Sequence, residues 1–144
     1  MGKLRVSGIY RSTSKGPQKM PLFAANVAAG FPSPADDYME GKLDLNELLI
    51  RHPAATFFVR VDGDSMTDAG IHSGDLLVVD RALETENNRI VIAVLNGELT
   101  VKRVLKKDGR LFLKAENERF ENIEITDDND FEVWGVVTHV IHHL

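Results

Sequence analysis

The feature that most limits the fold is a series of six short apolar runs between residues 56 and 141. They are rich in Val, Ile, Leu and Phe and are separated by turn residues, which is typical of β-strands. The runs are residues 56–61, 75–80, 89–95, 98–105, 110–114 and 131–141. They do not alternate with long helical patterns, so a parallel sheet with crossover helices is not expected. The sequence therefore predicts a mainly β domain with an antiparallel sheet.

The clearest turn is Asn96–Gly97, between two of these runs. Asn-Gly is a strong signal for a hairpin with a two-residue type I′ turn. Such a hairpin places Leu95 opposite Glu98 and, counting away from the turn, Val91 opposite Lys102. Because side chains alternate along a strand, one face of the hairpin then presents a shared set of residues. That face carries Val91, Ala93, Leu95, Glu98, Thr100, Lys102 and Val104.

Other local signals complete the expected architecture. The tripeptide at residues 107–109, Lys-Asp-Gly, predicts a second hairpin. Residues 33–36, Ser-Pro-Ala-Asp, have the form of a capping box with Pro at the first helical position, so a short helix is expected to begin there. A second helix is expected near Asp44, where leucines up to residue 49 share one face before Pro53 ends the helix.

The first 32 residues show no sustained periodicity and are expected to form an extended, mobile N-terminal arm. Residues 1–29 carry five bases and no acid, whereas the rest of the chain has a net charge of −10. A body this acidic is a poor binder of duplex DNA, which requires a basic face. Residues 20–29 end in small residues, as a signal peptide does, but Pro21 and Asn26 interrupt the apolar run. We expect a cytoplasmic protein whose strands all lie downstream of the arm.

Composition excludes several kinds of site. The 144 residues suffice for one compact domain, and no apolar stretch approaches the roughly 18 residues of a membrane span. Cysteine is absent, which excludes disulfides and thiolate zinc sites. His139, His142 and His143 are spaced as a metal site could be, yet they lie at the chain end with no carboxylate near them in the sequence. A frayed strand end is the favoured interpretation, and neither a metal nor a cofactor is expected.

Two residues are candidates for chemistry. Ser65 follows the first of the six runs and lies between Asp64 and Met66 in a loop. A loop serine is most often a turn residue, and no histidine near it in the sequence suggests a triad. Lys102 lies on the predicted hairpin face, where apolar neighbours would remove water from its amine.

Desolvation disfavours an ammonium ion and would lower the pKa of Lys102 from its usual value of about 10.4 towards neutrality. A neutral amine can accept the proton of a serine hydroxyl, which is how Ser–Lys hydrolases work without a histidine. The alternative interpretation is that Lys102 reaches out to solvent and takes no part in chemistry.

Taken together, these residues resemble the LexA/UmuD family of self-cleaving Ser–Lys proteins, and within it the UmuD branch. The likeness covers most of residues 30–141. It runs through FPSPADDY (31–38), LDLNELLIRHPAATFFVRVDGDSM (43–66), AGIHSGDLLVVD (69–80), GELTVKRV (97–104) and FEVWGVVTHVI (131–141). Ser65 in GDSM matches the family nucleophile, and Lys102 in TVKR matches its base. Ala29–Gly30 matches the bond that the family cleaves.

The resemblance implies a LexA/signal-peptidase-like antiparallel β fold and a role in the SOS response to DNA damage. A RecA–single-stranded-DNA filament would stimulate a cut that separates residues 1–29 from a catalytic and dimerisation domain of residues 30–144. The product would form a homodimer and serve as the accessory subunit of a UmuC-type translesion DNA polymerase. Neither direct sequence-specific DNA binding nor a membrane partner is expected.

Three alternatives stay open at this point. A non-catalytic polymerase scaffold would keep the fold and leave the Ser–Lys pair unused. A peptidase that acts on other chains, like a type I signal peptidase, would share the chemistry, although the sequence shows no membrane anchor. A LexA-like repressor would need a helix-turn-helix domain ahead of the cleaved bond, and the 29 residues before Gly30 are too few for one.

Overall fold

The computed structural model describes residues 4–13, 16–17, 19–23 and 39–144. These residues divide into two compact units, which are described separately. The first unit contains the described residues up to Ser12 together with His52–Leu144. The second unit lies between Thr13 and Arg51.

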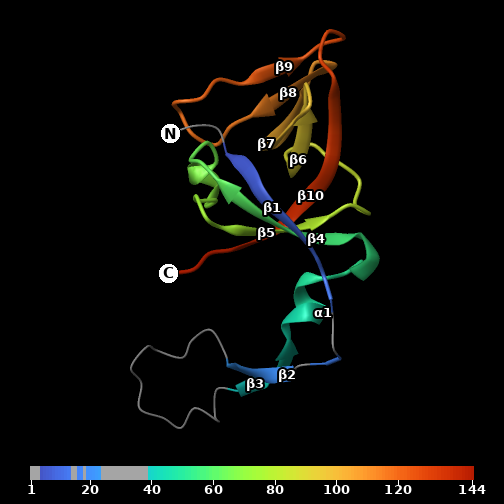
Figure 1. Cartoon of the computed structure of the whole chain (residues 1–144), viewed down its shortest axis with the longest axis vertical. Coiled ribbons are helices and arrows are strands. Elements are labelled where there is room, and N and C mark those ends of the chain that lie inside the picture. Colours follow the sequence, from blue (N-terminus) through green and yellow to red (C-terminus); the bar gives the residue numbers. More distant parts are fainter. Residues whose placement is uncertain (1–3, 14–15, 18, 24–38) are drawn as a thin grey trace. The chain divides into compact units, whose positions relative to one another are not determined.

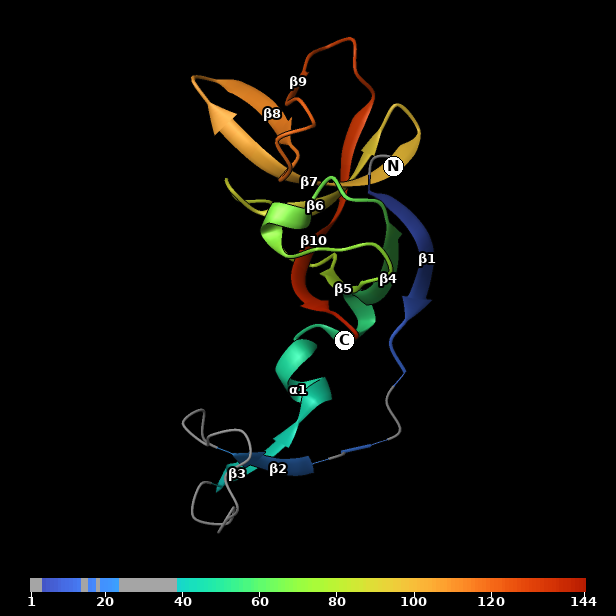
Figure 2. The same ribbon diagram turned by 90° about the vertical axis from the view of Figure 1, so that its left-hand side faces the viewer.

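The first unit is an antiparallel sheet of eight strands in the order β1-β4-β5-β10-β6-β7-β8-β9. An additional pairing of β1 with β7 joins the two ends of its first six strands, so the sheet closes into a small barrel-like form (Figures 1 and 2). The strands are β1 (Arg5–Arg11), β4 (Thr56–Asp62), β5 (Leu76–Asp80), β6 (Ile90–Leu95), β7 (Glu98–Lys107), β8 (Arg110–Lys114), β9 (Ile123–Ile125) and β10 (Phe131–Ile141). Two short 3₁₀ helices, Pro53–Ala55 and Thr67–Ala69, flank β4.

Two apolar clusters stabilise this unit. The first contains Leu4, Val59, Val61, Met66, Ile71, Leu77, Val79, Ile92, Val101 and Val137. The second contains Val91, Ala93, Val104, Leu113 and Val136. Neighbouring residues of β6 and β7 enter different clusters because their side chains alternate across the sheet. The β6–β7 hairpin therefore contributes to both clusters.

The six strands expected between residues 56 and 141 are confirmed, as is the mainly β fold class. The hairpin at Asn96–Gly97 is confirmed in detail, with positive φ angles of 50° and 85° and with Leu95 opposite Glu98. The second hairpin also forms, because Lys107 pairs with Arg110 across its turn. Both turns were readable from the sequence because residues with positive φ favour Asn, Asp and Gly.

The expectation that no strand precedes residue 56 is wrong. Residues 5–11 form β1, which pairs with β4 from Arg5 opposite Asp62 to Arg11 opposite Phe57. None of the β1 side chains is fully buried, and its register shifts between Val6 and Gly8. An exposed strand with an irregular register has no need of alternating apolar residues, so its sequence carries no strand signal.

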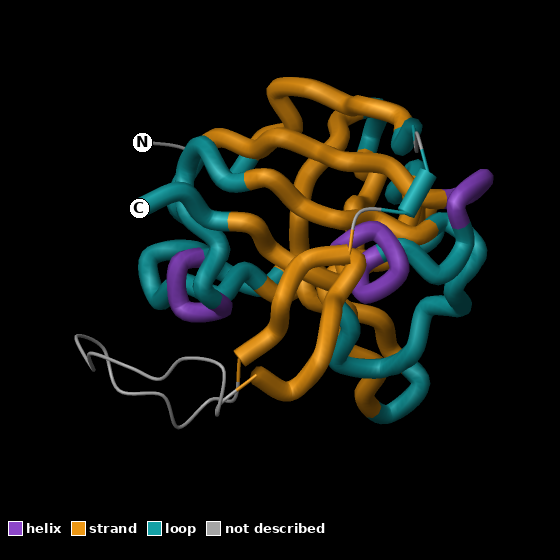
Figure 3. Tube along the Cα trace, turned by 90° about the horizontal axis from the view of Figure 1, so that it is seen from below, coloured by secondary structure: helices purple, strands orange, loops and turns teal. Residues whose placement is uncertain are grey.

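The second unit pairs β2 (Lys19–Phe23) with β3 (Met39–Asp44) in an antiparallel ladder, followed by α1 (Leu45–Leu49) (Figure 3). The helix expected near Asp44 is confirmed, and the Asp44 carboxylate caps it by accepting a hydrogen bond from the Asn46 N–H at 2.9 Å. Ala29–Gly30 and the helix expected from Ser33 lie outside the described residues. In the part of the chain that the structure describes, no helix is long and apolar enough to cross a membrane.

Candidate active site

Ser65 lies in the turn that leads out of β4, and its side chain is fully buried. The turn begins at Gly63, whose φ of 110° favours glycine. It ends in the 3₁₀ helix Thr67–Ala69, which Gly70 terminates in the left-handed conformation. Glycines at both ends let the chain reverse sharply, which turns Ser65 inward rather than towards solvent.

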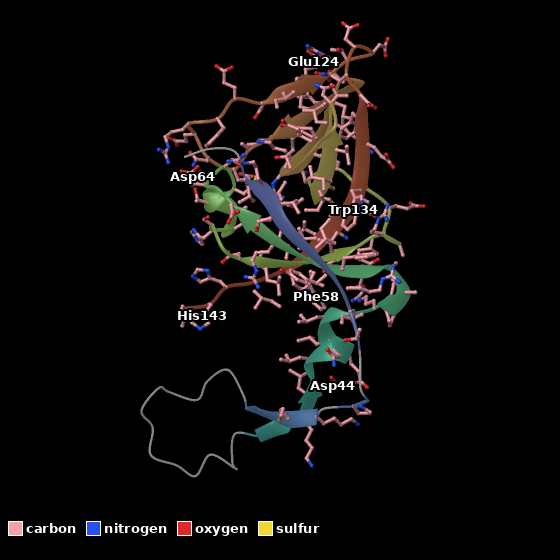
Figure 4. All side chains as sticks on the ribbon, viewed as in Figure 1. Asp44, Phe58, Asp64, Glu124, Trp134 and His143 are labelled. Atoms are coloured by element: carbon pink, nitrogen blue, oxygen red, sulfur yellow. The ribbon has the colours of Figure 1, made fainter. Side chains whose placement is uncertain are left out.

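A segment after β8 holds this turn in place. The Asn117 side-chain amide donates to the Asp64 carbonyl oxygen at 2.8 Å, and an Arg119 guanidinium N–H donates to Asp64 Oδ2 at 2.8 Å. The Glu116 N–H also donates to the Met66 sulfur at 3.3 Å. Both neighbours of Ser65 are therefore fixed from outside the turn, so its hydroxyl has a defined position. Figure 4 shows Asp64 at the end of the unit where β1 begins.

Lys102 lies on β7, opposite Val91 of β6, and is only 3% exposed. The pairing and the burial confirm the expected position, and the alternative in which the side chain reaches solvent is wrong. Its amine lies 5.8 Å from the centre of the Phe120 ring. Burial has therefore removed most of the water from around this lysine side chain.

A cavity of about 260 Å³ opens on the same face of the hairpin. It is lined by Leu95, Asn96, Glu98, Thr100, Lys102 and Ile123. This is the face that alternation predicts, with Lys102 and Thr100 two residues apart on β7. The cavity leaves open space beside the lysine.

Leu4 connects the serine turn to the lysine strand. Its backbone N–H donates to Ser65 Oγ at 2.9 Å, and its carbonyl oxygen accepts a hydrogen bond from Thr100 Oγ1 at 3.1 Å. The next residue, Arg5, pairs with Asp62 of β4 and with Thr100 of β7. The structure thus brings the Ser65 turn and the β7 face that carries Lys102 to one stretch of extended backbone.

Sequence reasoning missed both Leu4 and Thr100. Thr100 could have been found, because it shares the hairpin face with Lys102 and carries a hydroxyl among apolar residues. Leu4 had no such signal, because its partners Ser65 and Thr100 are distant in the sequence and no turn connects them to it.

The C-terminal histidines differ from the expectation that they lack a carboxylate partner. His142 Nδ1 forms a hydrogen bond with Asp75, which is 2% exposed. The sequence could not show this contact because Asp75 is distant from His142 in the chain, and only the pairing of Leu76 with Ile141 brings the two residues together. His139 lies within β10. Among the described residues, no three His, Asp or Glu side chains are grouped so that they could hold a metal ion.

Comparison with known proteins is consistent with this architecture. The family described as peptidase S24-like matches residues 21–138. ImpA of Salmonella typhimurium is 52% identical over 122 residues, which are 85% of this chain and 83% of ImpA. MucA of Escherichia coli is 47% identical over 126 residues, which are 86% of each chain. The LexA repressor of Shewanella piezotolerans is 36% identical over 137 residues, which are 92% of this chain and 66% of the repressor.

The match to the family spans both the Ser65 turn and the Lys102 strand. The identity to ImpA and MucA extends over most of the length of each relative, so the likeness is not limited to one motif. The chain therefore belongs to the peptidase S24-like family, as a UmuD-like member of the LexA/UmuD group.

Proposed function

We propose that this protein is a self-cleaving serine peptidase, with Ser65 as nucleophile, Lys102 as general base and Ala29–Gly30 as its own substrate. The observation that carries the proposal is the backbone of Leu4, which is next to the extended strand β1 and whose amide nitrogen lies 2.9 Å from Ser65 Oγ. A site that holds extended backbone against a buried serine hydroxyl, on the strand face of a buried lysine, has the parts that acyl transfer requires.

The first step forms an ester. Neutral Lys102 accepts the proton of the Ser65 hydroxyl, and the Ser65 oxygen attacks the carbonyl carbon of Ala29. Backbone N–H groups around Ser65 are the expected donors to the oxygen of the tetrahedral intermediate. The bond between Ala29 and Gly30 then breaks, and the Gly30 amine leaves with the proton that Lys102 carried. Ala29 remains esterified to Ser65.

The second step releases the enzyme. Lys102, neutral again, accepts a proton from water, and the resulting hydroxide attacks the Ala29 ester. The Ala29 carboxylate leaves, and Ser65 recovers its proton. Small residues suit the cleaved bond because the segment must lie extended against the sheet, and Gly30 lets the backbone approach without a Cβ clash. A substrate in the same chain also has a high effective concentration.

The family resemblance extends the proposal to biology. Cleavage would respond to a RecA–single-stranded-DNA filament in the SOS response. Residues 30–144 would then act as a homodimer with a UmuC-type translesion polymerase subunit. The five segments of likeness, which include GDSM and TVKR, support this role, as does identity to ImpA and MucA over most of their length.

The test is the mass of the purified protein after incubation with and without an activated RecA filament. Wild type should yield two fragments that divide between Ala29 and Gly30, and Ser65→Ala should stay intact while melting as a folded protein. Ser73→Ala is the matched control, because Ser73 lies in the next turn and accepts a backbone hydrogen bond from Gly63 at 3.2 Å. It should be cleaved like wild type.

Other outcomes identify the alternatives. If folded Ser65→Ala is cleaved as fast as wild type, Ser65 is not the nucleophile. If wild type stays intact with the filament present, the non-catalytic scaffold is favoured. Cleavage of added peptides with an intact Ala29–Gly30 bond would indicate a peptidase that acts on other chains.

A further inference from the structure

The space between β4 and β7, which we name the β4–β7 slot, is already filled. β1 occupies it by pairing with β4 along its whole length and with β7 at Arg5. Leu4, just before β1, is fully buried in the first apolar cluster. Its N–H and its carbonyl oxygen engage Ser65 and Thr100. A second extended segment therefore cannot use the same edge of β4 or the same polar groups while β1 is present.

The Ser65 hydroxyl also forms a hydrogen bond that does not prepare it for nucleophilic attack. Its oxygen accepts the Leu4 N–H, so a lone pair points at an amide hydrogen rather than at a carbonyl carbon. Nucleophilic attack needs the reverse arrangement, with the carbonyl carbon of the substrate about 3–3.5 Å from the oxygen. β1 thus resembles a bound peptide but holds the nucleophile in an unreactive hydrogen bond.

From these contacts we propose that residues 4–11 are a built-in competitor of the substrate. They occupy the β4–β7 slot and must leave it before the Ala29–Gly30 bond can reach Ser65. The inference rests on the proposed function, because it names what holds that same site inactive. On this inference, the slot binds one extended peptide strand at a time.

The strand is built so that it can leave. Ile9 and Tyr10 are 42% and 54% exposed, and the register shift between Val6 and Gly8 interrupts its ladder with β4. Beyond Arg5, the pairings of β1 with other described residues are all with β4. Leu4 is the buried anchor, so a single substitution there should loosen the strand while the rest of the barrel keeps its own contacts.

The first experiment measures self-cleavage without RecA for full-length Leu4→Asp. A charge in the apolar anchor site disfavours the occupied state, so the rate should rise by roughly tenfold or more, because the cost of emptying the slot is removed. Leu144→Asp is the matched control, since it introduces the same charge at a fully exposed leucine. A folded Leu4→Asp protein that is cleaved at the wild-type rate would overturn the inference.

A second experiment uses a milder variant of the full-length chain. A synthetic peptide of residues 1–12 is added to full-length Leu4→Ala, in which the anchor of β1 is shortened. The peptide should slow self-cleavage of this protein in proportion to its concentration, whereas the same peptide with Leu4→Asp should not. Equal rates with and without the peptide would overturn the inference.

The two proposals fail separately. If full-length Leu4→Ala and the wild type are both intact with RecA present, the proposed function fails. The slot is then judged by the fluorescence polarisation of labelled peptide 1–12 mixed with full-length Leu4→Ala. Saturable binding that Leu4→Asp in the peptide weakens supports the strand receptor, and no binding overturns it. If cleavage proceeds and requires Ser65 but ignores the peptide, only the competitor inference is lost.

Discussion

The β6–β7 hairpin and β1 are neighbours in the same sheet, yet they are held by different means. The hairpin pairs from Leu95 opposite Glu98 to Ile90 opposite Arg103, so its partners are close in the sequence. β1 pairs Arg5 with Asp62, a residue more than fifty positions away. The candidate base lies on the hairpin, and the segment that covers the candidate nucleophile precedes β1. The hairpin that carries Lys102 is therefore held by contacts that are local in the sequence, whereas the segment that we propose must leave the slot is held by distant ones.

This difference has an energetic basis. A two-residue turn closes the hairpin with little loss of chain entropy, and both of its faces are buried in apolar clusters. β1 pairs with β4 across a much longer loop, whose closure costs more chain entropy, and most of its side chains are exposed. Regions with few buried contacts open more readily than the core of the same domain. Three further experiments test how far this contrast holds.

The largest effect is expected at Lys102, which lies on the β6–β7 hairpin. If its neutral amine is the base, self-cleavage without RecA should accelerate as pH rises and then level off, because the neutral fraction grows with pH. Lys102→Arg should lose about a thousandfold or more of the rate at every pH, because a guanidinium stays protonated. Cleavage rates measured by intact mass across the pH range check this.

Lys114→Arg provides the control, since that residue lies on the neighbouring strand β8 opposite Arg103. Its pH profile should match that of wild type. A flat wild-type profile, or an active Lys102→Arg protein, would remove Lys102 from the role of base.

An intermediate effect is expected from truncating one buried side chain in the β6–β7 hairpin and one next to β1. Val101→Ala on β7 should lower the free energy of unfolding of the whole unit by about 2 kcal/mol. Leu4→Ala should lower the free energy of unfolding by less, because we expect β1 to detach before the barrel unfolds. Leu4 then no longer contributes to the stability of the remaining barrel. Hydrogen exchange should show the same order, with β1 amides less protected than those of β6 and β7. Equal protection would mean that β1 is part of the rigid core.

The smallest effect is expected at the edge of the sheet, where Arg110 and Glu124 join β8 to β9 at 2.6 Å. The hydrogen bond from Arg110 lowers the pKa of the Glu124 carboxyl below its ordinary value. A carboxyl whose pKa is lowered by folding contributes stability above its unfolded pKa, and this is lost as pH falls through the folded one. Since both groups are exposed, solvent and salt should keep the contribution small.

Thermal melting from neutral pH to about pH 4 can detect this contribution as a slightly steeper acid loss in wild type than in Arg110→Ala. Arg60→Ala is the comparison variant, because Arg60 donates to the Gly74 carbonyl at 2.8 Å rather than to an acid. Its difference from wild type should not change over this range. Identical slopes for wild type and Arg110→Ala would show that the ion pair has no measurable role.

The sequence predicted the strands and turns wherever the signal was local. Asn96–Gly97 determined a turn, the turn determined the register, and the register placed Lys102 opposite Val91, as the structure confirms. Asp44 marked a helix start for the same reason, because an N-cap acts on residues two positions away. These features depend on backbone conformations that few residue types favour.

The features that the sequence did not predict depend on contacts between residues that are far apart in the sequence. Nothing in the first twelve residues indicates that Leu4 enters the core, because its partners come from β4 and β7. The contact between His142 and Asp75 was missed for the same reason. That Ser65 and Lys102 act together is still a prediction, supported by the family match and by the burial of both side chains.

The pairing of β1 with β4 also separates two events that a single cut would seem to combine. If Ala29–Gly30 is hydrolysed as proposed, the polypeptide divides, but residues 5–11 keep the backbone groups by which they pair with β4. Once the cleaved end has left the β4–β7 slot, the released fragment can bind there again and complement the barrel of the longer chain. Full activation would then depend on the dissociation of that fragment, a reversible step set by its concentration and affinity, so the rate of cleavage and the rate of activation need not agree.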